Sequence, residues 1–288
     1  MSTSRIALYI GNELYPGSGS DPAGTTKILQ QSPLTSPILS LLNQISPTST
    51  ELVYNDPVNP VFNTSGDYIG SSQWPGIIAN LRGGNIQEVY LSFSTTGTQY
   101  MGNLIKSNNA AASKILSYIK NTLKVDGIDL DWEGSDYSPN SPLYSVAAAA
   151  IQAGLKLTAA PFFNKSAWAA WVKFVQSKQG TVSWLNLQCY AGGKSNNPGT
   201  WLDMGVPIVA GSCNSCGLPT TTCSPSDMQN LFTLWRTGQG PVISPNCWTG
   251  TRNSTPQAIG GGFIWVYSSI PAAQFSAYMT ALKNGLGM

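Results

Sequence analysis

The sequence predicts an α/β fold built as a single (β/α)8 TIM barrel, one domain that takes up residues 1–288. Eight short apolar runs lie along the chain, amphipathic segments separate them, and no linker or repeat divides the sequence. Parallel strands joined by helices give this alternation, and such barrels commonly run to about 250 residues as one domain. An open, doubly wound sheet is the alternative, although no Gly-rich phosphate loop follows any of the runs.

The expected strands are runs rich in β-branched and other apolar residues. They are Ile6–Ile10, Leu52–Asn55, Val89–Phe93, Gly127–Trp132, Leu155–Ala159, Leu185–Tyr190, Ile208–Gly211 and Gly262–Tyr267. Helices are expected between them, with apolar residues at helical spacing in Ala111–Leu123, Trp168–Val175 and Met228–Trp235. The helix expected before the fifth strand, near Val146–Ala153, is short and Ala-rich. Their Trp and Phe side chains are expected to pack in the core, because an amphipathic helix turns its apolar stripe inward.

The composition excludes several classes of function. Charged residues make up 10% of the chain and the net charge is +2, so we expect an uncharged ligand and no nucleic-acid partner. No run of 18 apolar residues occurs, so we expect no membrane span. The sequence contains no histidine, which excludes Ser-His-Asp and Cys-His catalysis and His-ligated metal sites. Acid–base chemistry near neutral pH must then come from carboxylates, Tyr, Lys or Cys.

The five cysteines indicate an oxidising compartment. Cys213, Cys216, Cys223 and Cys247 lie close together in the sequence, while Cys189 stands apart in an apolar run. Two loop disulfides and one buried free thiol are the favoured interpretation. A zinc or redox pair at Cys213 and Cys216 is the alternative, but no second Cys-x-x-Cys occurs. We therefore expect a secreted, extracellular protein, although this chain carries no signal peptide at its start.

The segment Asp126–Glu133 holds four of the 13 acidic residues of the chain. Side chains alternate along a strand, so Asp129, Asp131 and Glu133 share one face and the apolar residues between them share the other. In a barrel the acidic row faces the lumen and ends with Glu133 at the carboxyl end of the strand, where barrel active sites lie. Burial and neighbouring carboxylates raise a carboxyl pKa, as a general acid requires. An acidic edge strand and a carboxylate site for a divalent metal are the alternatives.

Paired carboxylates in such a position are typical of glycosidases, but a separate nucleophile is missing. A retaining glycosidase usually places its acid and its nucleophile about 5 Å apart, on either side of the scissile bond. Asp131 and Glu133 instead lie on one side of one strand, and beyond Asp136 the chain has only Asp203 and Asp227. The nucleophile is therefore expected to belong to the substrate, as in the substrate-assisted exceptions.

The motif Asp126-Gly-Ile-Asp-Leu-Asp-Trp-Glu133 resembles the DGxDxDxE signature of glycoside hydrolase family 18, the chitinases, at every defined position. Four further stretches resemble the first, fifth, sixth and eighth strands of plant and fungal class III chitinases. These are Ile6–Asn12, Leu157–Pro161, Gln188–Tyr190 and Gly261–Trp265. The resemblance spans the chain and implies a barrel enzyme that hydrolyses β-1,4 bonds between N-acetylglucosamine units in chitin or chitooligosaccharides.

The resemblance also implies the catalytic roles. Glu133 is expected to act as general acid/base, while the acetamido carbonyl of the sugar attacks its own anomeric carbon. Asp131 is expected to orient that acetamido group and to stabilise its positive charge, and Asp129 to share a proton or hydrogen bond with Asp131. Tyr190 is expected to donate a hydrogen bond to the acetamido oxygen. No cofactor or metal is implied, and we expect a monomer.

Substrate binding is expected at Gln188, which lines the same site, at Trp265, which forms an apolar floor, and at Tyr9 on the first strand. Three tryptophans in expected loops are further candidates for stacking on sugar faces, namely Trp74, Trp201 and Trp248.

Two positions depart from the family pattern. The third strand reads Ser92-Phe-Ser-Thr95 where the family often has Ser-x-Gly-Gly, which bears on the shape of the cleft. Ala191 follows Tyr190 where many members have Asp.

Only about 50 residues separate the seventh and eighth strands, so the α+β insertion of one subfamily does not fit, and we expect a shallow groove with endo-type cutting. An endo-β-N-acetylglucosaminidase acting on the N-glycan core and a non-catalytic chitin-binding lectin are the alternatives.

Overall fold

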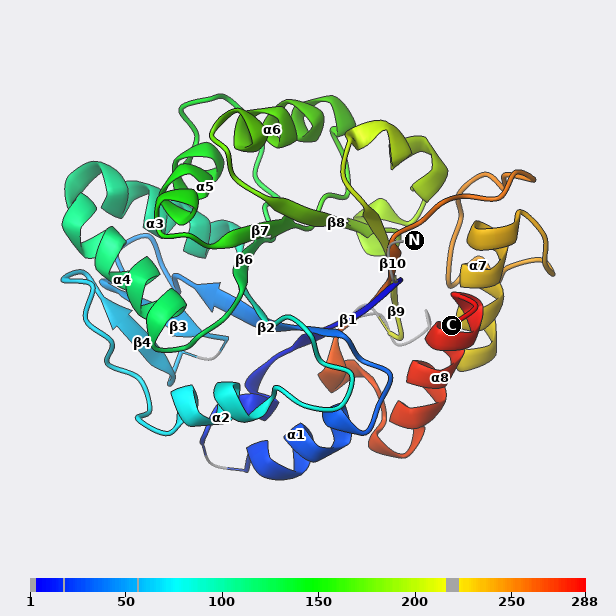
Figure 1. Ribbon diagram of the computed structural model, residues 1–288, viewed down its shortest axis with the longest axis horizontal. Helices are drawn as coiled ribbons and strands as arrows, with labels where there is room; N and C mark the ends of the chain where they lie inside the picture. The colour runs from blue at the N-terminus through cyan, green and yellow to red at the C-terminus, as the bar shows by residue number, and fades with distance from the viewer. Residues whose placement is uncertain (1–3, 18, 56, 216–222) are drawn as a thin grey trace.

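A computed structural model describes residues 4–17, 19–55, 57–215 and 223–288. Within these residues, eight parallel strands form a closed ring in the order β1, β2, β5, β6, β7, β8, β9, β10, and β10 pairs with β1 again (Figure 1). Helices surround the ring on its outside (Figure 1). The prediction of a (β/α)8 barrel is confirmed, and the described residues between β9 and β10 contain no α+β insertion domain.

The strands of the barrel are short and their connections carry the helices. The barrel strands are β1 (Arg5–Ile10), β2 (Ser36–Asn43), β5 (Tyr90–Phe93), β6 (Gly127–Leu130), β7 (Lys156–Ala159), β8 (Val182–Gln188), β9 (Ile208–Cys213) and β10 (Gly261–Trp265). The α-helices are α1 (Pro22–Gln30), α2 (Trp74–Asn80), α3 (Thr95–Ser107), α4 (Asn109–Asn121), α5 (Pro142–Gln152), α6 (Lys165–Ser177), α7 (Pro225–Thr237) and α8 (Phe275–Gly285). Short 3-10 helices are η1 (Asn12–Leu14), η2 (Ala191–Gly193), η3 (Pro198–Met204), η4 (Tyr267–Ser269) and η5 (Ala272–Gln274). Across the ranges that the structure describes, none of these helices has the length and apolar character that crossing a membrane requires.

The second barrel strand differs from the prediction. Leu52–Asn55 coincides with β3 (Glu51–Tyr54), which runs antiparallel to β2 and forms a hairpin with β4 (Pro60–Asn63) outside the ring. The true second strand is β2, which pairs in parallel with both β1 and β5. Its sequence contains Pro37 and is rich in Ser and Leu, so it lacks the β-branched signal. Proline is tolerated here because it lies at the beginning of the strand.

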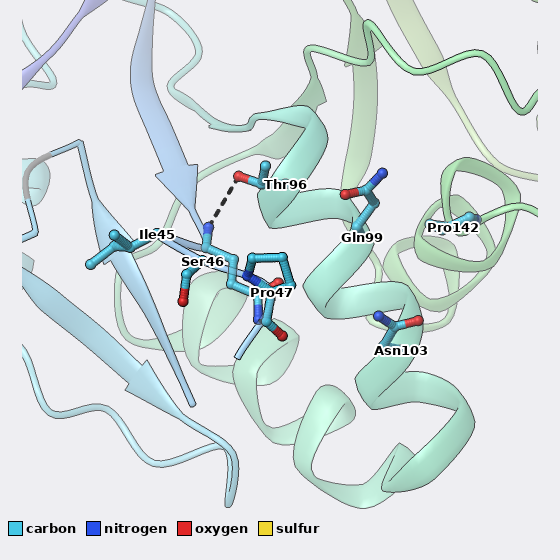
Figure 2. A pocket seen from close by; sticks show the side chains of 8 residues that line it. Ile45, Ser46, Pro47, Thr96, Gln99, Asn103 and Pro142 are labelled. Carbon is cyan, nitrogen blue, oxygen red and sulfur yellow. Dashed lines mark hydrogen bonds between the residues drawn. The ribbon is translucent and has the colours of Figure 1, made fainter. Parts of the chain in front are cut away.

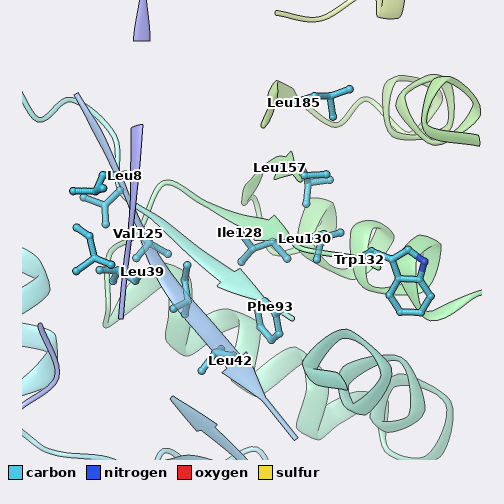
Figure 3. Packing of buried hydrophobic residues seen from close by; sticks show 14 of the residues in the cluster. Leu8, Leu39, Leu42, Phe93, Val125, Ile128, Leu130, Trp132, Leu157 and Leu185 are labelled. Carbon is cyan, nitrogen blue, oxygen red and sulfur yellow. The ribbon is translucent and has the colours of Figure 1, made fainter. Parts of the chain in front are cut away.

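Alternating side chains along the strands separate two apolar layers. In β6, Ile128 and Leu130 point outward to the helices, and Trp132 continues the same face beyond the strand (Figure 3). A second cluster fills the lumen, with Tyr90 and Trp184 among its fully buried members. The predicted alternation of the acidic segment is therefore confirmed for its apolar residues, and it leaves the aspartates of this segment on the side of the lumen.

The tryptophans expected on helices and the three expected in loops all lie in the core. Trp168, Trp171 and Trp235 are fully buried in the outer layer, which confirms the expected core packing of the helices. The expectation that loop tryptophans stack on sugars is wrong, because the side chains in question are only 0%, 4% and 5% exposed. These residues are Trp74, Trp201 and Trp248, respectively.

The cysteines follow the disulfide interpretation where the structure describes them. Cys223 and Cys247 form a disulfide, and Cys213 is also disulfide-bonded, so it is not a thiolate ligand for zinc. Cys216 lies outside the described residues. Cys189 is a buried free thiol, as expected.

Removing the Cys223–Cys247 disulfide is expected to lower the free energy of unfolding by about 3 kcal/mol, because the bond restricts the unfolded chain. Its two cysteines are 24 residues apart in the sequence. Denaturant unfolding of the variant Cys223→Ser/Cys247→Ser, compared with the unmodified protein, measures this loss. Cys189→Ala is the matched control for losing a buried sulfur without a cross-link. An equal midpoint for the double variant and the unmodified protein would contradict the expectation.

Candidate active site

Asp129 occupies the middle of the lumen and is fully buried. The hydroxyls of Tyr9 and Ser92 donate hydrogen bonds to its Oδ2 at 3.0 and 2.7 Å. Thr158 Oγ1 and Asn186 Nδ2 donate to its Oδ1 at 2.7 and 3.1 Å. Burial raises the pKa of Asp129, and these donors oppose the rise by stabilising the carboxylate. The carboxyl group thus joins its own strand β6 to β1, β5, β7 and β8.

The expected hydrogen bond between Asp129 and Asp131 is not formed among the described residues. The four donors already occupy the four lone-pair directions of the Asp129 carboxylate, which leaves none for its neighbour. The two aspartates still interact through their charges. Burial, the charge of Asp129 and the charge of Glu133 all raise the pKa of Asp131, in that order.

Gln188, at the end of β8, bridges the two carboxyl groups at the mouth of the barrel. Its Nε2 donates to Asp131 Oδ1 at 3.2 Å and lies 3.4 Å from Glu133 Oε1. The same nitrogen donates to the backbone oxygen of Ala160, the residue after β7, at 3.0 Å, and this contact fixes the orientation of the amide. Asp131 and Glu133 therefore share one donor and lie on the same side of the site.

Thr95 holds the backbone that carries Glu133. Strand β6 ends at Leu130, but the N–H of Asp131 still donates to the oxygen of Phe93 on β5 at 2.9 Å. Two residues further along each strand direction, Thr95 Oγ1 accepts a hydrogen bond from the N–H of Glu133 at 2.8 Å. The same hydroxyl donates to the backbone oxygen of Asp131 at 3.4 Å. The Thr95 side chain thus continues the pairing of β5 with β6 beyond the ends of the strands. Thr95 is one of the positions where this sequence departs from the Ser-x-Gly-Gly pattern.

A pocket of about 150 Å³ opens above these carboxyl groups. Its lining consists of Asp131, Glu133, Gln188, Tyr190, Ala191 and Trp265. Burial and both carboxyl groups raise the pKa of Tyr190, so its hydroxyl stays protonated and able to donate. The structure therefore brings together five of the seven predicted site residues around one cavity, with an indole, a phenol, an amide and two carboxyl groups.

Tyr9 and Asp129 lie beneath this pocket and do not line it. Tyr9 is fully buried, its hydroxyl is used by Asp129, and its ring lies 4.9 Å from that of Trp265, centroid to centroid. The structure thus places Tyr9 as a support for both residues, which corrects the expectation that it contacts the substrate directly.

The donor groups around Asp129 were not assigned from the sequence. Ser92, Thr158 and Asn186 have the inward parity of their strands, so strand alternation is the signal that finds them. Thr95 has no such signal, because it follows the end of its strand. Among the described residues, no group of three or more acidic or cysteine side chains is arranged to hold a metal ion.

Comparison with known proteins supports the fold. No protein-family model matches the chain, and no curated protein matches it either. Its structure is similar to a GH18 chitinase from Pseudoalteromonas aurantia, with a TM-score of 0.63 and 16% identity over 98% of this chain and 100% of that chain. The catalytic domain of a GH18 chitinase from the fern Peteris ryukyuensis has a TM-score of 0.57 and 16% identity over 98% and 99%.

A third similar structure is the spore cortex-lytic enzyme SleL of Bacillus cereus, with a TM-score of 0.55 and 13% identity over 98% of this chain and 75% of that chain. Two of these proteins are chitinases and the third is a spore cortex-lytic enzyme, so fold similarity does not choose a substrate. At these identities the comparison establishes that the chain has the barrel fold of these proteins.

Proposed function

We propose that this protein is a family 18 glycoside hydrolase, an endo-acting chitinase that cleaves β-1,4 bonds between N-acetylglucosamine units with retention. The signature from Asp126 to Glu133 and the pocket around its last two acidic residues support the proposal. Glu133 is exposed at the pocket, where a carboxyl group reaches a glycosidic oxygen, and Trp265 offers an apolar face for the sugar ring. In this account the protein is a secreted monomer without a cofactor.

In the first step Glu133 transfers its proton to the glycosidic oxygen as the bond to the anomeric carbon breaks. The acetamido oxygen of the same sugar attacks that carbon and closes a five-membered oxazolinium ring, which displaces the leaving sugar. Asp131 orients the acetamido N–H and stabilises the positive charge. Tyr190 keeps its proton, donates a hydrogen bond from its hydroxyl to the acetamido oxygen and positions that oxygen for attack.

In the second step a water molecule attacks the anomeric carbon and opens the oxazolinium ring. Glu133, now a carboxylate, accepts a proton from that water. The anomeric carbon has been inverted twice, so the product keeps the β configuration. Asp129 is held beneath Asp131 by its four donors. Its charge adds to burial in raising the pKa of Asp131.

The observation that carries this proposal is the position of the carboxyl groups. Asp131 and Glu133 both lie within hydrogen-bond range of a single nitrogen of Gln188, and no other carboxylate of the described residues lines the pocket. An enzyme nucleophile on the far side of the sugar is therefore missing from the described residues. The acetamido group of the substrate supplies that function, which restricts the reaction to sugars that carry one.

A matched pair of oligosaccharides tests this proposal. The wild-type protein is expected to cleave the hexasaccharide of N-acetylglucosamine and to leave the corresponding glucose hexasaccharide intact, because glucose has no acetamido group. Cleavage of both would contradict substrate assistance. Cleavage of an N-glycan core alone would indicate the endo-β-N-acetylglucosaminidase alternative, and binding without any cleavage would indicate a lectin.

Thr95→Val is expected to lower kcat about fivefold and to change KM little, because it removes one hydrogen bond worth about 1 kcal/mol that holds Glu133. Thr95→Ser keeps the hydroxyl and is the matched control, expected to retain the wild-type kcat. Steady-state kinetics on the hexasaccharide measures both. Equal loss in the two variants would show that packing, and not the hydroxyl, is responsible.

A further inference from the structure

A second and larger pocket lies on the same face of the barrel, beside α3. It has a volume of about 360 Å³ and no charged side chain in its lining. The lining consists of Gln44, Ile45, Ser46, Pro47, Thr96, Gln99, Asn103 and Pro142 (Figure 2). Its walls are the loop that follows β2, one side of α3 and the first residue of α5.

Two carboxamides in this pocket are free to bind a ligand. Gln99 and Asn103 are four residues apart on α3, which places them on one face of the helix, between Pro47 and Pro142 (Figure 2). Both side chains are exposed, and neither forms a hydrogen bond to another residue that the structure describes. Each carboxamide offers two donor protons and an acceptor oxygen, the groups that pair with an acetamido group or a sugar hydroxyl.

The opposite wall is held in place and offers apolar contact. The N–H of Gln44 donates to Thr96 Oγ1 at 3.2 Å, and the Gln44 side chain donates to the oxygen of Ser49 at 2.9 Å. Ile45 is 51% exposed although it is a large apolar residue. Proline rings and an isoleucine beside unpaired amides suit a neutral sugar, which presents both apolar C–H faces and polar groups.

Backbone and hydrogen bonds connect this pocket to the proposed catalytic centre. Thr95, which binds the N–H of Glu133, is followed directly by Thr96, which lines the second pocket. Both pockets lie beyond the carboxyl ends of barrel strands, the second pocket where β2 and β5 end and the catalytic pocket where β6, β8 and β10 end. Strands β5 and β6 are neighbours in the ring. The catalytic pocket, at about 150 Å³, is smaller than the roughly 300 Å³ at which ligand sites usually begin. A polymeric substrate therefore needs binding surface outside it.

We propose that the pocket beside α3 is a second saccharide-binding site, which holds a distant part of the same N-acetylglucosamine chain while the scissile bond lies at Glu133. Gln99 and Asn103 bind the acetamido groups and hydroxyls of the sugar, and Ile45, Pro47 and Pro142 contact its apolar faces. This inference rests on the proposed substrate class. It predicts that the site contributes to the binding of long chains and contributes nothing to short ones.

Binding of two sugars to a non-hydrolysing protein tests the second site. In the Glu133→Gln background, Gln99→Ala/Asn103→Ala is expected to weaken binding of the N-acetylglucosamine hexasaccharide about thirtyfold, the loss expected for two neutral hydrogen bonds. Binding of the disaccharide is expected to stay unchanged. Gln152→Ala/Gln176→Ala removes two exposed carboxamides from α5 and α6 and is the matched control, expected to bind both sugars as the background does. Isothermal titration calorimetry gives the affinities, and thermal unfolding confirms that each variant is folded.

The outcomes separate this inference from the proposed function. Full hexasaccharide affinity in the folded α3 variant contradicts the second site, even where the wild type cleaves chitin. Equal weakening of both sugars also contradicts it, because the loss is then not confined to the distant part of a long chain. A selective loss together with a wild type that cleaves nothing supports the second site and contradicts hydrolysis. Absence of binding in the background protein contradicts both.

Discussion

Glu133→Gln is expected to lower hydrolysis of the N-acetylglucosamine hexasaccharide by on the order of a hundredfold or more, because the amide has no proton to give to the leaving oxygen. The amide keeps the size of the side chain and its contact with Gln188, so substrate binding is expected to persist. Turnover is measured by chromatography of the products, and binding by calorimetry on the same preparation.

Glu51→Gln is the matched control for this substitution. Glu51 lies in β3, in the hairpin outside the ring, and does not line the pocket. Its replacement is expected to leave turnover at the wild-type level. Activity in Glu133→Gln comparable to that of the control would remove Glu133 from the mechanism and with it the proposed acid.

Asp131→Asn is expected to lower turnover by on the order of a hundredfold, the usual effect of removing a group that stabilises charge in the transition state. Asparagine keeps the shape of the side chain and can still accept the hydrogen bond from Gln188. It has no charge to stabilise the oxazolinium ion and orients the acetamido N–H less strongly. Steady-state kinetics on the hexasaccharide measures this loss.

The same substitution is expected to stabilise the folded protein at neutral pH. The pKa of Asp131 is raised on folding, so between the unfolded value of about 3.9 and the raised value the native state binds more protons than the unfolded chain. The contribution of this group to stability therefore falls as the pH rises through that window. Asp131→Asn removes the penalty, so its melting temperature should exceed that of the wild type at pH 7 and equal it below about pH 4.

Asp129→Asn provides the contrast. An amide would present its own protons to two of the donors around it, and these would lose their acceptor. We expect a loss of about 1–3 kcal/mol in the free energy of unfolding at neutral pH. The two substitutions are thus expected to change the free energy of unfolding in opposite directions, because Asp129 has four donors whereas Asp131 has, among the described residues, only Gln188. A stabilising effect of Asp129→Asn would show that the hydrogen bonds of Asp129 do not dominate its contribution to stability.

Strand alternation accounts for most of what could be predicted about the site. It separates Asp129 and Asp131 from Ile128 and Leu130, and the structure has the two sets on opposite faces. The hydrogen bonds of Asp129 could not be predicted, because they depend on which strands are neighbours across the lumen. The row of aspartates suggests that Asp129 and Asp131 share a proton. In the structure, donors from four other strands satisfy the Asp129 carboxylate without a shared proton.

The second strand and the tryptophans show where local patterns fail. Strand β2 has a single β-branched residue, Ile38, and contains Pro37, whereas the hairpin strand β3 has the composition of a barrel strand. Pairing with β1 and β5 decides which of them enters the ring, and a sequence does not display that pairing. Trp201 and Trp248 lie outside the α-helices, yet tertiary packing buries them, so their place in the sequence did not indicate exposure.

The configuration of the first products tests the central claim most directly. Hydrolysis of the N-acetylglucosamine hexasaccharide by the wild-type protein should be followed by proton NMR within the first minutes, before the anomers equilibrate. Attack by the acetamido group followed by attack of water predicts an initial excess of the β-anomer at the new reducing ends. An initial excess of the α-anomer would mean a single displacement by water, and it would contradict substrate assistance.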